Sequence, residues 1–414
     1  MPAETHHRIE RLAAHGEARI EWASRAMPVL AELGAGRIAD KAFEGLRVAL
    51  CLHLTAETGV LASLLGELGA EVSVAAAHPL STQDDVAAAL ASRGIPTHAQ
   101  RGADSIGHRQ QIRDALSIRP QLVVDNSGLA IAELHDAPEL LSGVLGGTLE
   151  TRSGVAGLRA LAESRRLAFP VIAVNEARTK HLFDNRLGTG QSVIDGILRA
   201  TGRLLAGSAF VVAGYGHCGR GIAERARGMG ARVFVTEVDP VRALEAAMDG
   251  YRVTTMAKAA KLGDFFCAAT GSPLAIRAEH FAAMRDGAIV ANAGLFDEEL
   301  DLPGLDAIAR PRRVRELVDE YELPSGRRIS VIASGALVNL VAGEGHPSAL
   351  MDLSFANLVL CLDYLARHAD SLERKVYAVP DALDREIAEL KLRSMGVAID
   401  KLSRAQRARL RAPH

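Results

Sequence analysis

The sequence predicts an α/β protein that contains two doubly wound domains and a helical C-terminal segment. Short apolar runs alternate with amphipathic stretches along most of the chain, which is the pattern of parallel strands joined by helices. The chain of 414 residues is also too long for one ordinary hydrophobic core, so two domains are expected.

The first half of the chain is predicted to form a parallel α/β unit. It begins with a helix over residues 8–34, whose apolar residues recur on one face and which Gly34 and Gly36 would close. Strands are predicted at 47–52, 71–75, 122–125 and 171–174. Helices are predicted between them at 58–68, 83–92 and 154–163.

The second half begins near residue 190 with an amphipathic helix over 190–203. Its strands are predicted at 210–213, 233–237, 253–255, 265–270, 288–292 and, as the last one, 329–333. An apolar helix over 347–368 and charged, helical residues over 379–410 follow. We expect one domain from residues 1–188, completed by 346–378, a second from 189–345, and a C-terminal segment from 379–414.

A glycine-rich turn follows the first strand of the second half. Gly214 and Gly216 permit a tight turn close to a pyrophosphate, and Gly219 lets the next helix pack against the strand. The following strand ends in Glu237, eighteen residues after Gly219, which is close to the spacing of a carboxylate that holds the 2′-hydroxyl of NAD. Strand, glycines, helix and acid in this order favour a Rossmann-like NAD site over a plain tight turn. Arg242 would suit the extra phosphate of NADP, but Glu237 favours NAD.

Charge and cysteine usage exclude several other classes of protein. The formal net charge is −2, from 48 basic and 50 acidic residues. The one basic stretch, residues 404–411, is expected to be a solvated or subunit-contact face, so no nucleic-acid partner is predicted. The four cysteines are far apart and form no CxxC pair, which predicts no zinc site and no disulfide and favours a reducing cytoplasm. The sequence shows no signal-peptide pattern and no apolar run of about 18 residues, so a cytoplasmic protein without a membrane partner is expected.

Polar side chains gather where the predicted strands of the first half end, which is the edge at which open α/β sheets bind ligands. They are His53, Thr55, Asp125, Asn126, Glu150, Thr151, Lys180, Asp184 and Asn185. Each has a purely structural explanation, such as a helix cap, a solvated lysine or a buried histidine. Lys180 and Asp184 are four residues apart, which would place an ammonium and a carboxylate on one helical face. A lysine paired in this way beside a nicotinamide can accept the proton of a hydroxyl that is being oxidised.

Several motifs, in the same order along the chain, resemble the S-adenosylhomocysteine hydrolase family. They are residues 179–180, 183–185, 192–196, 212–216, 230–233, 236–240, 337–340 and 345–348. The similarity extends over nearly the whole chain, from residues 27–28 to 401–402. The resemblance implies a substrate-binding domain split around an internal NAD-binding domain, and a homotetramer or homodimer.

The resemblance also implies a reaction and a set of site residues. Bound NAD would oxidise the ribose 3′-hydroxyl of an adenine nucleoside, and the 4′-hydrogen and the 5′ substituent would leave. Water would then add at C5′, and NADH would return its hydride. The residues implied in this chemistry are His53, Asn126, Glu150, Lys180 and Asp184. Those implied around the nucleoside are Thr55, Glu57, Gln83, Asp125, Leu295, His346 and Met351. Those implied around NAD are Thr151, Arg152, Ser153, Asn185, Gly214, Gly216, His217, Cys218, Gly219, Glu237, Arg242, Thr270, Asn292 and Asn339, and no metal ligand is implied.

The chain departs from the family pattern at four places. Asn126 stands where the family has a catalytic aspartate, and Leu295 stands where it has a histidine near the 5′ leaving group. An amide does not exchange protons near neutral pH and leucine makes no hydrogen bond, which would leave His53 for proton transfer at C5′. Arg152 replaces a threonine. The family's C-terminal lysine and tyrosine, which reach a neighbour's NAD, have no counterpart before His414, which would weaken closure of the cofactor by a neighbouring subunit.

Three functions are compatible with this pattern. Intact oxidation residues beside altered C5′ residues favour an NAD-dependent lyase or dehydratase that eliminates the 5′ substituent and releases a 4′,5′-unsaturated nucleoside. The alternative is an ordinary S-adenosylhomocysteine hydrolase in which His53 and ordered water compensate. The third is a catalytically silent NAD and nucleoside sensor, which the retention of both Lys180 and Asp184 disfavours because binding alone needs no hydroxyl-activating pair.

Overall fold

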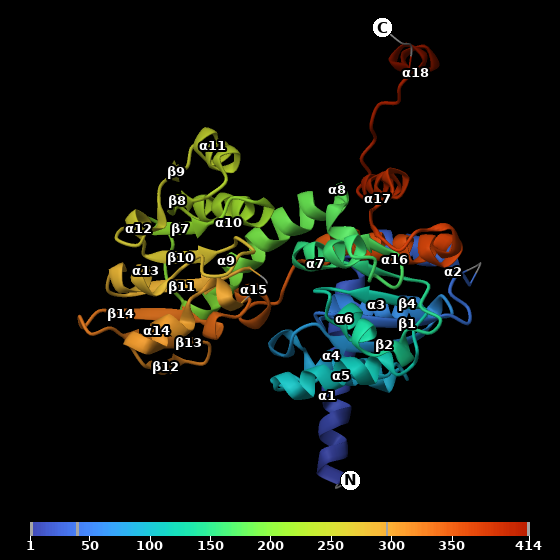
Figure 1. The fold of residues 1–414 in the computed structure, drawn as a ribbon, viewed down its shortest axis with the longest axis horizontal. Helices are drawn as coiled ribbons and strands as arrows, with labels where there is room; N and C mark the ends of the chain where they lie inside the picture. The colour runs from blue at the N-terminus through green and yellow to red at the C-terminus, as the bar shows by residue number, and fades with distance from the viewer. Residues whose placement is uncertain (1–2, 39–40, 295–296, 412–414) are drawn as a thin grey trace.

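Two β-sheets, each covered by helices on both faces, lie side by side in the computed structural model of the protein (Figure 1). The structure describes residues 3–38, 41–294 and 297–411. One sheet has seven strands and the other has eight. The predicted α/β fold class is therefore confirmed.

The first sheet is built mainly from the first half of the chain, and all of its described strand pairs are parallel. Its strand order is β15-β6-β5-β4-β1-β2-β3. The strands are β1 (Arg47–Leu52), β2 (Glu71–Ala76), β3 (Thr97–His98), β4 (Leu122–Asp125), β5 (Gly146–Leu149), β6 (Val171–Ala173) and β15 (Val376–Ala378). Because β15 pairs with β6, the chain returns to this sheet after it has built the other one.

The helices that accompany the first sheet come from both ends of the chain. They are α1 (Ala3–Ser24), α2 (Pro28–Ile38), α3 (Ala56–Glu67), α4 (Asp84–Ser92), α5 (Ser105–Leu116), α6 (Leu129–Asp136), α7 (Arg152–Glu163), α8 (Arg178–Lys180), α16 (Ser348–His368), α17 (Asp381–Ser394) and α18 (Arg404–Arg411). Short 3₁₀ turns, η1 (Pro79–Ser81), η2 (Pro138–Leu140), η3 (Val174–Glu176) and η7 (Ala369–Ser371), complete this half. Of these helices, α18 follows the others in the chain but does not cover the sheet, since Figure 1 shows it far from both sheets.

The second sheet has the order β12-β13-β14-β11-β10-β7-β8-β9. Its strands are β7 (Ala209–Ala213), β8 (Arg232–Thr236), β9 (Arg252–Val253), β10 (Phe265–Ala268), β11 (Ala288–Asn292), β12 (Pro311–Arg315), β13 (Val318–Glu322) and β14 (Arg328–Ile332). Strands β14 to β9 are parallel, whereas β12 and β13 add an antiparallel edge.

Helices on both faces cover the second sheet. They are α9 (Thr189–Thr201), α10 (His217–Gly228), α11 (Pro240–Met248), α12 (Met256–Ala259), α13 (Ala278–Ala283), α14 (Leu302–Ile308) and α15 (Val338–Val341), with the turns η5 (Asp297–Glu299) and η6 (Ala333–Gly335). A π-helical segment, η4 (His181–Gly188), joins α8 to α9 and so leads from the first sheet to the second.

Alternating side chains explain why the strands are apolar along their whole length. In β7, Phe210 and Val212 pack into one core cluster, while Ala209 and Val211 pack into another on the opposite face. Successive side chains of a strand point to opposite faces, and a parallel sheet with helices on both sides buries both. The sequence signal for such strands is therefore a continuous apolar run.

The helix predicted over residues 8–34 is in fact two helices, α1 and α2, so this prediction was wrong in part. Pro28 begins α2, because proline lacks an N–H and disfavours helical geometry in the residue before it. The first turn of α2 is held by Asp352 of α16, which accepts hydrogen bonds from the backbone N–H of Val29 at 3.2 Å and of Leu30 at 2.8 Å. Gly34 lies inside α2 and does not end it.

Several other elements differ from the prediction. The sequence analysis did not anticipate β3, β5, α5 and α6, nor the antiparallel strands β12 and β13. The strand predicted at 329–333 is β14, which is the last strand of the second sheet as expected, whereas β15 of the first sheet was not anticipated. The charged C-terminal region is not one helix, since α17 ends at Ser394 and α18 begins at Arg404.

The long apolar helix α16 is part of the protein core. Among the described residues, the segment Ser348–Ser371 is the one stretch long and apolar enough to cross a membrane by length and composition. In its most apolar window, 72% of the residues are buried inside the protein. Leu358 and Leu362 of this helix pack against the first sheet in the largest buried cluster.

Candidate active site

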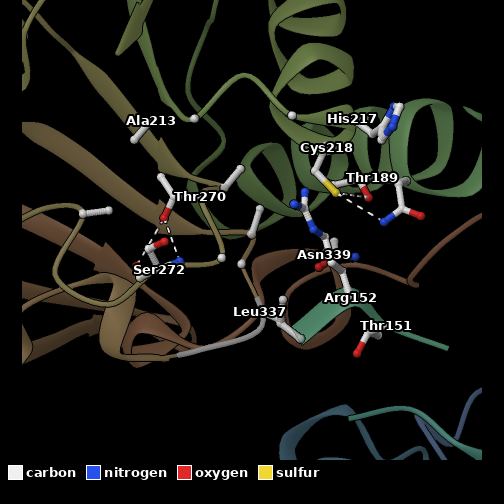
Figure 2. A pocket seen from close by; sticks show the side chains of 18 of the residues that line it. Thr151, Arg152, Thr189, Ala213, His217, Cys218, Thr270, Ser272, Leu337 and Asn339 are labelled. Carbon is white, nitrogen blue, oxygen red and sulfur yellow. Dashed lines mark hydrogen bonds between the residues drawn. The ribbon is translucent and has the colours of Figure 1, made fainter. Parts of the chain in front are cut away.

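The carboxyl ends of strands from both sheets open onto one cavity of about 980 Å³. The sequence-predicted residues that line it are His53, Thr55, Glu57, Asn126, Glu150, Thr151, Arg152, Lys180, Asp184, Asn185, Gly214, Gly216, His217, Cys218, Glu237, Arg242, Thr270, Asn339, His346 and Met351. The two halves of the chain therefore share one site. Figure 2 shows part of this lining, with Thr151 and Arg152 from one half and His217, Cys218 and Thr270 from the other.

The glycine turn between β7 and α10 forms one wall of the cavity. Gly214 has φ +93°, a left-handed conformation that suits glycine. A Cβ atom on Gly219 would lie only 2.0 Å from the carbonyl oxygen of Gly214, so the helix can approach the turn this closely only without a side chain. A Cβ atom on Gly216 would meet nothing nearer than Arg242 Nη1 at 3.8 Å, which leaves open space in front of the turn. The N-terminus of α10 borders this space and is suited to an anion.

Glu237 follows β8 and lies beside the same turn. Its carboxylate accepts hydrogen bonds from the backbone N–H of Tyr215 at 2.7 Å, Val238 at 2.6 Å and Asp239 at 3.0 Å. These bonds hold the Glu237 side chain in the lining of the cavity. The carboxylate is thus oriented before any ligand binds.

A second wall of the cavity contains a buried charged cluster. Lys180 Nζ donates to Asp184 Oδ1 at 3.2 Å and to Asn185 Oδ1 at 3.1 Å. Asp184 Oδ1 is also 3.1 Å from His346 Nδ1, and Asp184 Oδ2 accepts from Ser354 Oγ at 2.6 Å. The predicted pairing of Lys180 with Asp184 on one helical face is therefore present, and α16 adds a partner from far along the chain.

Opposite charges keep this pair ionised despite its burial. Burial alone would raise the pKa of Asp184, but Lys180 and His346 outweigh it and hold that pKa far below its usual range. Burial likewise opposes the charge of Lys180, but Asp184 and Glu150 outweigh it and raise the lysine pKa above its ordinary value. Lys180 is consequently an ammonium at neutral pH.

Glu150 and Asn126 lie next to each other at the ends of β5 and β4. Asn126 Nδ2 donates to Glu150 Oε2 at 2.9 Å, and both side chains are buried. Burial raises the pKa of Glu150, although the charge of Lys180 acts in the opposite direction. Asn126 Oδ1 is buried and has no hydrogen-bond partner among the described residues. This oxygen is available to a ligand that donates a hydrogen bond.

His53 lies at the end of β1. Its Nδ1 is 2.7 Å from Ser81 Oγ. Burial, together with His78, His346 and Lys180 nearby, lowers the pKa of His53 to about 3. The imidazole is therefore neutral at physiological pH and is a weak base.

The remaining polar residues of this side form a small network around Glu57. Thr55 Oγ1 donates to Glu57 Oε2 at 2.7 Å, and Ser348 Oγ donates to Glu57 Oε1 at 2.5 Å. Gln83 does not line the cavity, but its Oε1 accepts from the backbone N–H of Ala56 at 3.1 Å, so it supports the same turn.

Some predicted site residues do not reach the cavity. Asp125 is fully buried and accepts from the backbone N–H groups of Ser127, Gly128 and Ile131, which makes it part of a turn after β4. Asn292 Oδ1 accepts from the N–H of Gly294 at 2.9 Å. Gly219 packs behind the turn, Leu295 lies outside the described residues, and the side chain of Ser153 is likewise outside the described part. No group of three or more His, Cys, Asp or Glu side chains among the described residues is placed to hold a metal ion.

The lining residues that the sequence analysis missed include two whole loops. Residues 271–275, in the loop after β10, and residues 254–257, after β9, line the cavity. Buried Glu299 holds the first of these loops by accepting from the backbone N–H of Thr270 at 2.9 Å and of Gly271 at 2.8 Å. The signal was available, because both loops follow the carboxyl ends of predicted parallel strands.

The fold and the cavity define a dinucleotide-dependent α/β enzyme. The open glycine turn and the oriented Glu237 suit a dinucleotide, and Asn339 Oδ1 is buried in the lining without a partner among the described residues. The buried lysine–carboxylate pair lies in the same cavity, where a substrate hydroxyl can be activated.

Comparisons with known proteins agree with this class and specify it. Residues 185–345 match the family model described as S-adenosyl-L-homocysteine hydrolase, NAD binding domain, and residues 8–142 match the model described as S-adenosyl-L-homocysteine hydrolase. The adenosylhomocysteinase of Aquifex aeolicus is 53% identical over 399 residues, which cover 96% of each chain. The adenosylhomocysteinase of Aeropyrum pernix is 52% identical over 96% of each chain. That of Saccharolobus solfataricus is 50% identical over 96% of this chain and 95% of the other. The chain belongs to the S-adenosyl-L-homocysteine hydrolase family, and its cofactor is NAD.

Proposed function

We propose that this protein is an adenosylhomocysteinase, which hydrolyses S-adenosylhomocysteine to adenosine and homocysteine. The observation that carries this proposal is the buried Lys180–Asp184 pair in a cavity that also contains an open glycine turn. Identity of 53% to an adenosylhomocysteinase over almost the whole chain supports hydrolysis over the elimination that the sequence analysis favoured. In this reaction the C5′–S bond breaks and a C5′–O bond forms from water.

Lys180 and Glu150 are assigned to the ribose 3′-oxygen. When bound, NAD would accept a hydride from C3′ and return it to C3′ after the chemistry at C5′, so the net reaction is redox-neutral. Because Lys180 is an ammonium, it can donate a hydrogen bond to the 3′-oxygen and stabilise the negative charge that develops there. Asp184 is a poor proton acceptor because its pKa is lowered, whereas the pKa of Glu150 is raised. Glu150 is therefore the better acceptor for the hydroxyl proton, a role that the sequence analysis gave to Lys180.

Asn126 and His53 are assigned to the C5′ side of the substrate. Glu150 Oε2 accepts a hydrogen bond from the Nδ2 group of Asn126, so the buried Oδ1 of this cavity-lining residue is the amide atom left without a partner among the described residues. This oxygen can accept from a water molecule at C5′. Neutral His53 can accept a proton from the same water, although its low pKa makes it a weak base. Water addition is thus assisted by two groups that carry no net charge.

Elimination without hydration is the second candidate function. The observation that favours it is the amide at position 126, which cannot protonate a leaving group. In this case the product would be the 4′,5′-unsaturated nucleoside, and the enzyme would act as a lyase or dehydratase. A silent NAD and nucleoside sensor has the least support, because binding alone needs no hydroxyl-activating pair such as Lys180 and Asp184.

The products formed by the NAD-loaded protein from S-adenosylhomocysteine in ¹⁸O-labelled water distinguish these functions. We expect adenosine with one ¹⁸O atom at its 5′ position, measured by mass spectrometry, together with an equal amount of homocysteine. An unlabelled 4′,5′-unsaturated nucleoside as the only nucleoside product, again with an equal amount of homocysteine, would establish elimination. Binding without any product would establish the sensor.

Glu237 is expected to select NAD over NADP. Glu237→Ala should weaken NAD binding by about 10- to 100-fold, since a hydrogen bond to a charged group contributes about 1.5–3 kcal/mol. The same change should improve NADP binding relative to NAD, because the carboxylate repels the 2′-phosphate. Calorimetric titration of both dinucleotides checks this, with Glu245→Ala, the same charge change on the exposed side of α11, as the control. Equal preference for both dinucleotides in the unmodified protein would contradict the assignment.

We further propose a division of labour, an assembly state and a location. The nucleoside would bind residues 1–188 with 346–378, and NAD would bind residues 189–345. Exposed apolar side chains on α11, Val241, Leu244 and Met248, support a homodimer or homotetramer, because such faces are commonly buried between subunits. Four free cysteines support the cytoplasm.

A further inference from the structure

Arg152 is a cation that the first half of the chain presents to the cofactor turn of the second half. It is the first residue of α7, which follows β5 of the first sheet, and it lines the shared cavity. In Figure 2 it lies between Thr151, from its own segment, and Cys218, in the first turn of α10. Its side chain therefore extends across the boundary between the two sheets.

Among the described residues, no protein group neutralises this cation. In the part of the chain that the structure describes, no hydrogen bond or ion pair holds the Arg152 guanidinium. The nearest candidate acid in the sequence, Glu150, is hydrogen-bonded to Asn126. Glu237 is engaged by the backbone N–H groups of its own turn.

Other positive groups lie around the same turn. Arg242 Nη1 is 3.8 Å from the position that a Cβ atom of Gly216 would take. Burial lowers the pKa of His217, and the charges of Arg242 and Arg152 lower it further, so both arginines lie near the first residue of α10. Asp239 balances Arg242 in part, since the two charges interact. Arg152 thus adds an unbalanced positive charge next to a helix N-terminus that already favours anions.

We propose that Arg152 binds the pyrophosphate of NAD from the side opposite the glycine turn and thereby ties the two halves of the protein together through the cofactor. The turn and the α10 N-terminus contribute backbone N–H groups from the second half. Arg152 contributes a guanidinium from the first half, whose planar donors fit phosphate oxygens in pairs. The threonine that stands here in the family pattern offers one neutral hydroxyl, so the arginine adds a charge that the threonine lacks. This proposal concerns cofactor binding and does not depend on the reaction that follows.

The test is the affinity of the full-length protein, stripped of its cofactor, for dinucleotides and their fragments. Arg152→Ala is expected to weaken NAD and ADP-ribose, which both contain the pyrophosphate, by about 10- to 100-fold at low salt. Binding of nicotinamide riboside and adenosine, which lack phosphate, should not change. Arg152→Lys should recover part of the loss, because it keeps the charge but not the paired geometry. Raising the salt concentration should weaken NAD binding more in the unmodified protein than in Arg152→Ala.

Arg186→Ala is the matched control. The charge of Arg186 also reaches His217, but its guanidinium is paired with Glu224 and does not line the cavity. Arg186→Ala should change NAD affinity by no more than about twofold. A loss equal to that of Arg152→Ala would show that NAD responds to the total positive charge near the glycine turn and not to a contact with Arg152. Two further results would overturn the proposal. One is unchanged NAD affinity in Arg152→Ala, and the other is a loss confined to NADP, which would place Arg152 at the 2′-phosphate.

A separate measurement tests whether Arg152 and NAD connect the two halves of the protein. Amide hydrogen exchange in the first turn of α7 should slow when NAD is added to the unmodified protein and should change much less in Arg152→Ala saturated with NAD. Equal protection in both proteins would contradict a tie through Arg152, even if the affinities differ.

Discussion

Replacing Lys180 with alanine is expected to slow the formation of bound NADH by about 10²–10⁴-fold when S-adenosylhomocysteine is added to the NAD-loaded protein. The ammonium is buried, is held by Asp184 at 3.2 Å, and lies in the same cavity as Glu150. Without it, no cation among these groups stabilises the 3′-oxygen as its proton leaves. The measurement is the rise in NADH absorbance in a single turnover.

The controls separate chemistry from folding. Breaking a buried ion pair can cost about 3–5 kcal/mol of stability, so near-ultraviolet circular dichroism and NAD content must match those of the unmodified protein. Lys391→Ala removes another lysine from a carboxylate, Asp352, at 2.9 Å but outside the cavity, and it should not affect the absorbance change. If Lys180→Ala does not fold, Lys180→Met keeps most of the side-chain volume. An unchanged rate in a folded, NAD-loaded variant would remove Lys180 from the mechanism.

Replacing Asn126 with aspartate is expected to accelerate the hydrolysis of S-adenosylhomocysteine by about 10²-fold. The new carboxyl would lie beside Glu150, whose Oε2 is 2.9 Å from the present amide nitrogen. Two carboxyl groups this close share a proton, and one of them takes a raised pKa. The pair could then protonate the leaving group and afterwards activate water, which the amide cannot do. Adding Leu295→His to Asn126→Asp should increase the effect.

Asn126→Ala is the control for this prediction, because it removes the amide without supplying a carboxyl group. It should not accelerate hydrolysis, and it should lower any water addition that depends on Oδ1. Adenosine and homocysteine are measured together by mass spectrometry, with NAD content as the check on the number of active sites. Hydrolysis that is unchanged or slower in Asn126→Asp would place this residue away from the reacting C5′ atom.

The predicted strands and helices that the structure reproduces are those with strong local signals. The strands β1 and β4 have the predicted limits, because a strand buried on both faces is a continuous apolar run. Strand β5 was missed because it begins with Gly146 and Gly147, which weaken a strand pattern. A Cβ atom on Gly146 would lie 2.9 Å from Leu365 of α16, so these glycines allow a close approach that only the folded chain reveals.

The candidate site also contains some features that local sequence predicts and others that it does not. The glycine turn and Glu237 were predictable, since a strand, a turn and a helix are contiguous in sequence and their geometry is local. The i, i+4 spacing likewise predicted contact between Lys180 and Asp184, and the structure contains it. No local pattern indicated that Ser354 of α16 donates to Asp184, or that Glu299 holds the loop after β10.

The sequence by itself determined the α/β class, the NAD turn, the family and the pairing of Lys180 with Asp184. All of these depend on neighbouring residues or on motifs in a fixed order. Tertiary structure decided the features that need residues far apart in the chain. Asp352 caps α2, β15 returns to the first sheet, and Glu150 accepts from the amide nitrogen of Asn126, whose buried oxygen has no partner among the described residues. The physical reason is that buried polar groups must find partners wherever the fold places them. A local sequence pattern does not indicate which residues from distant parts of the chain will lie next to each other.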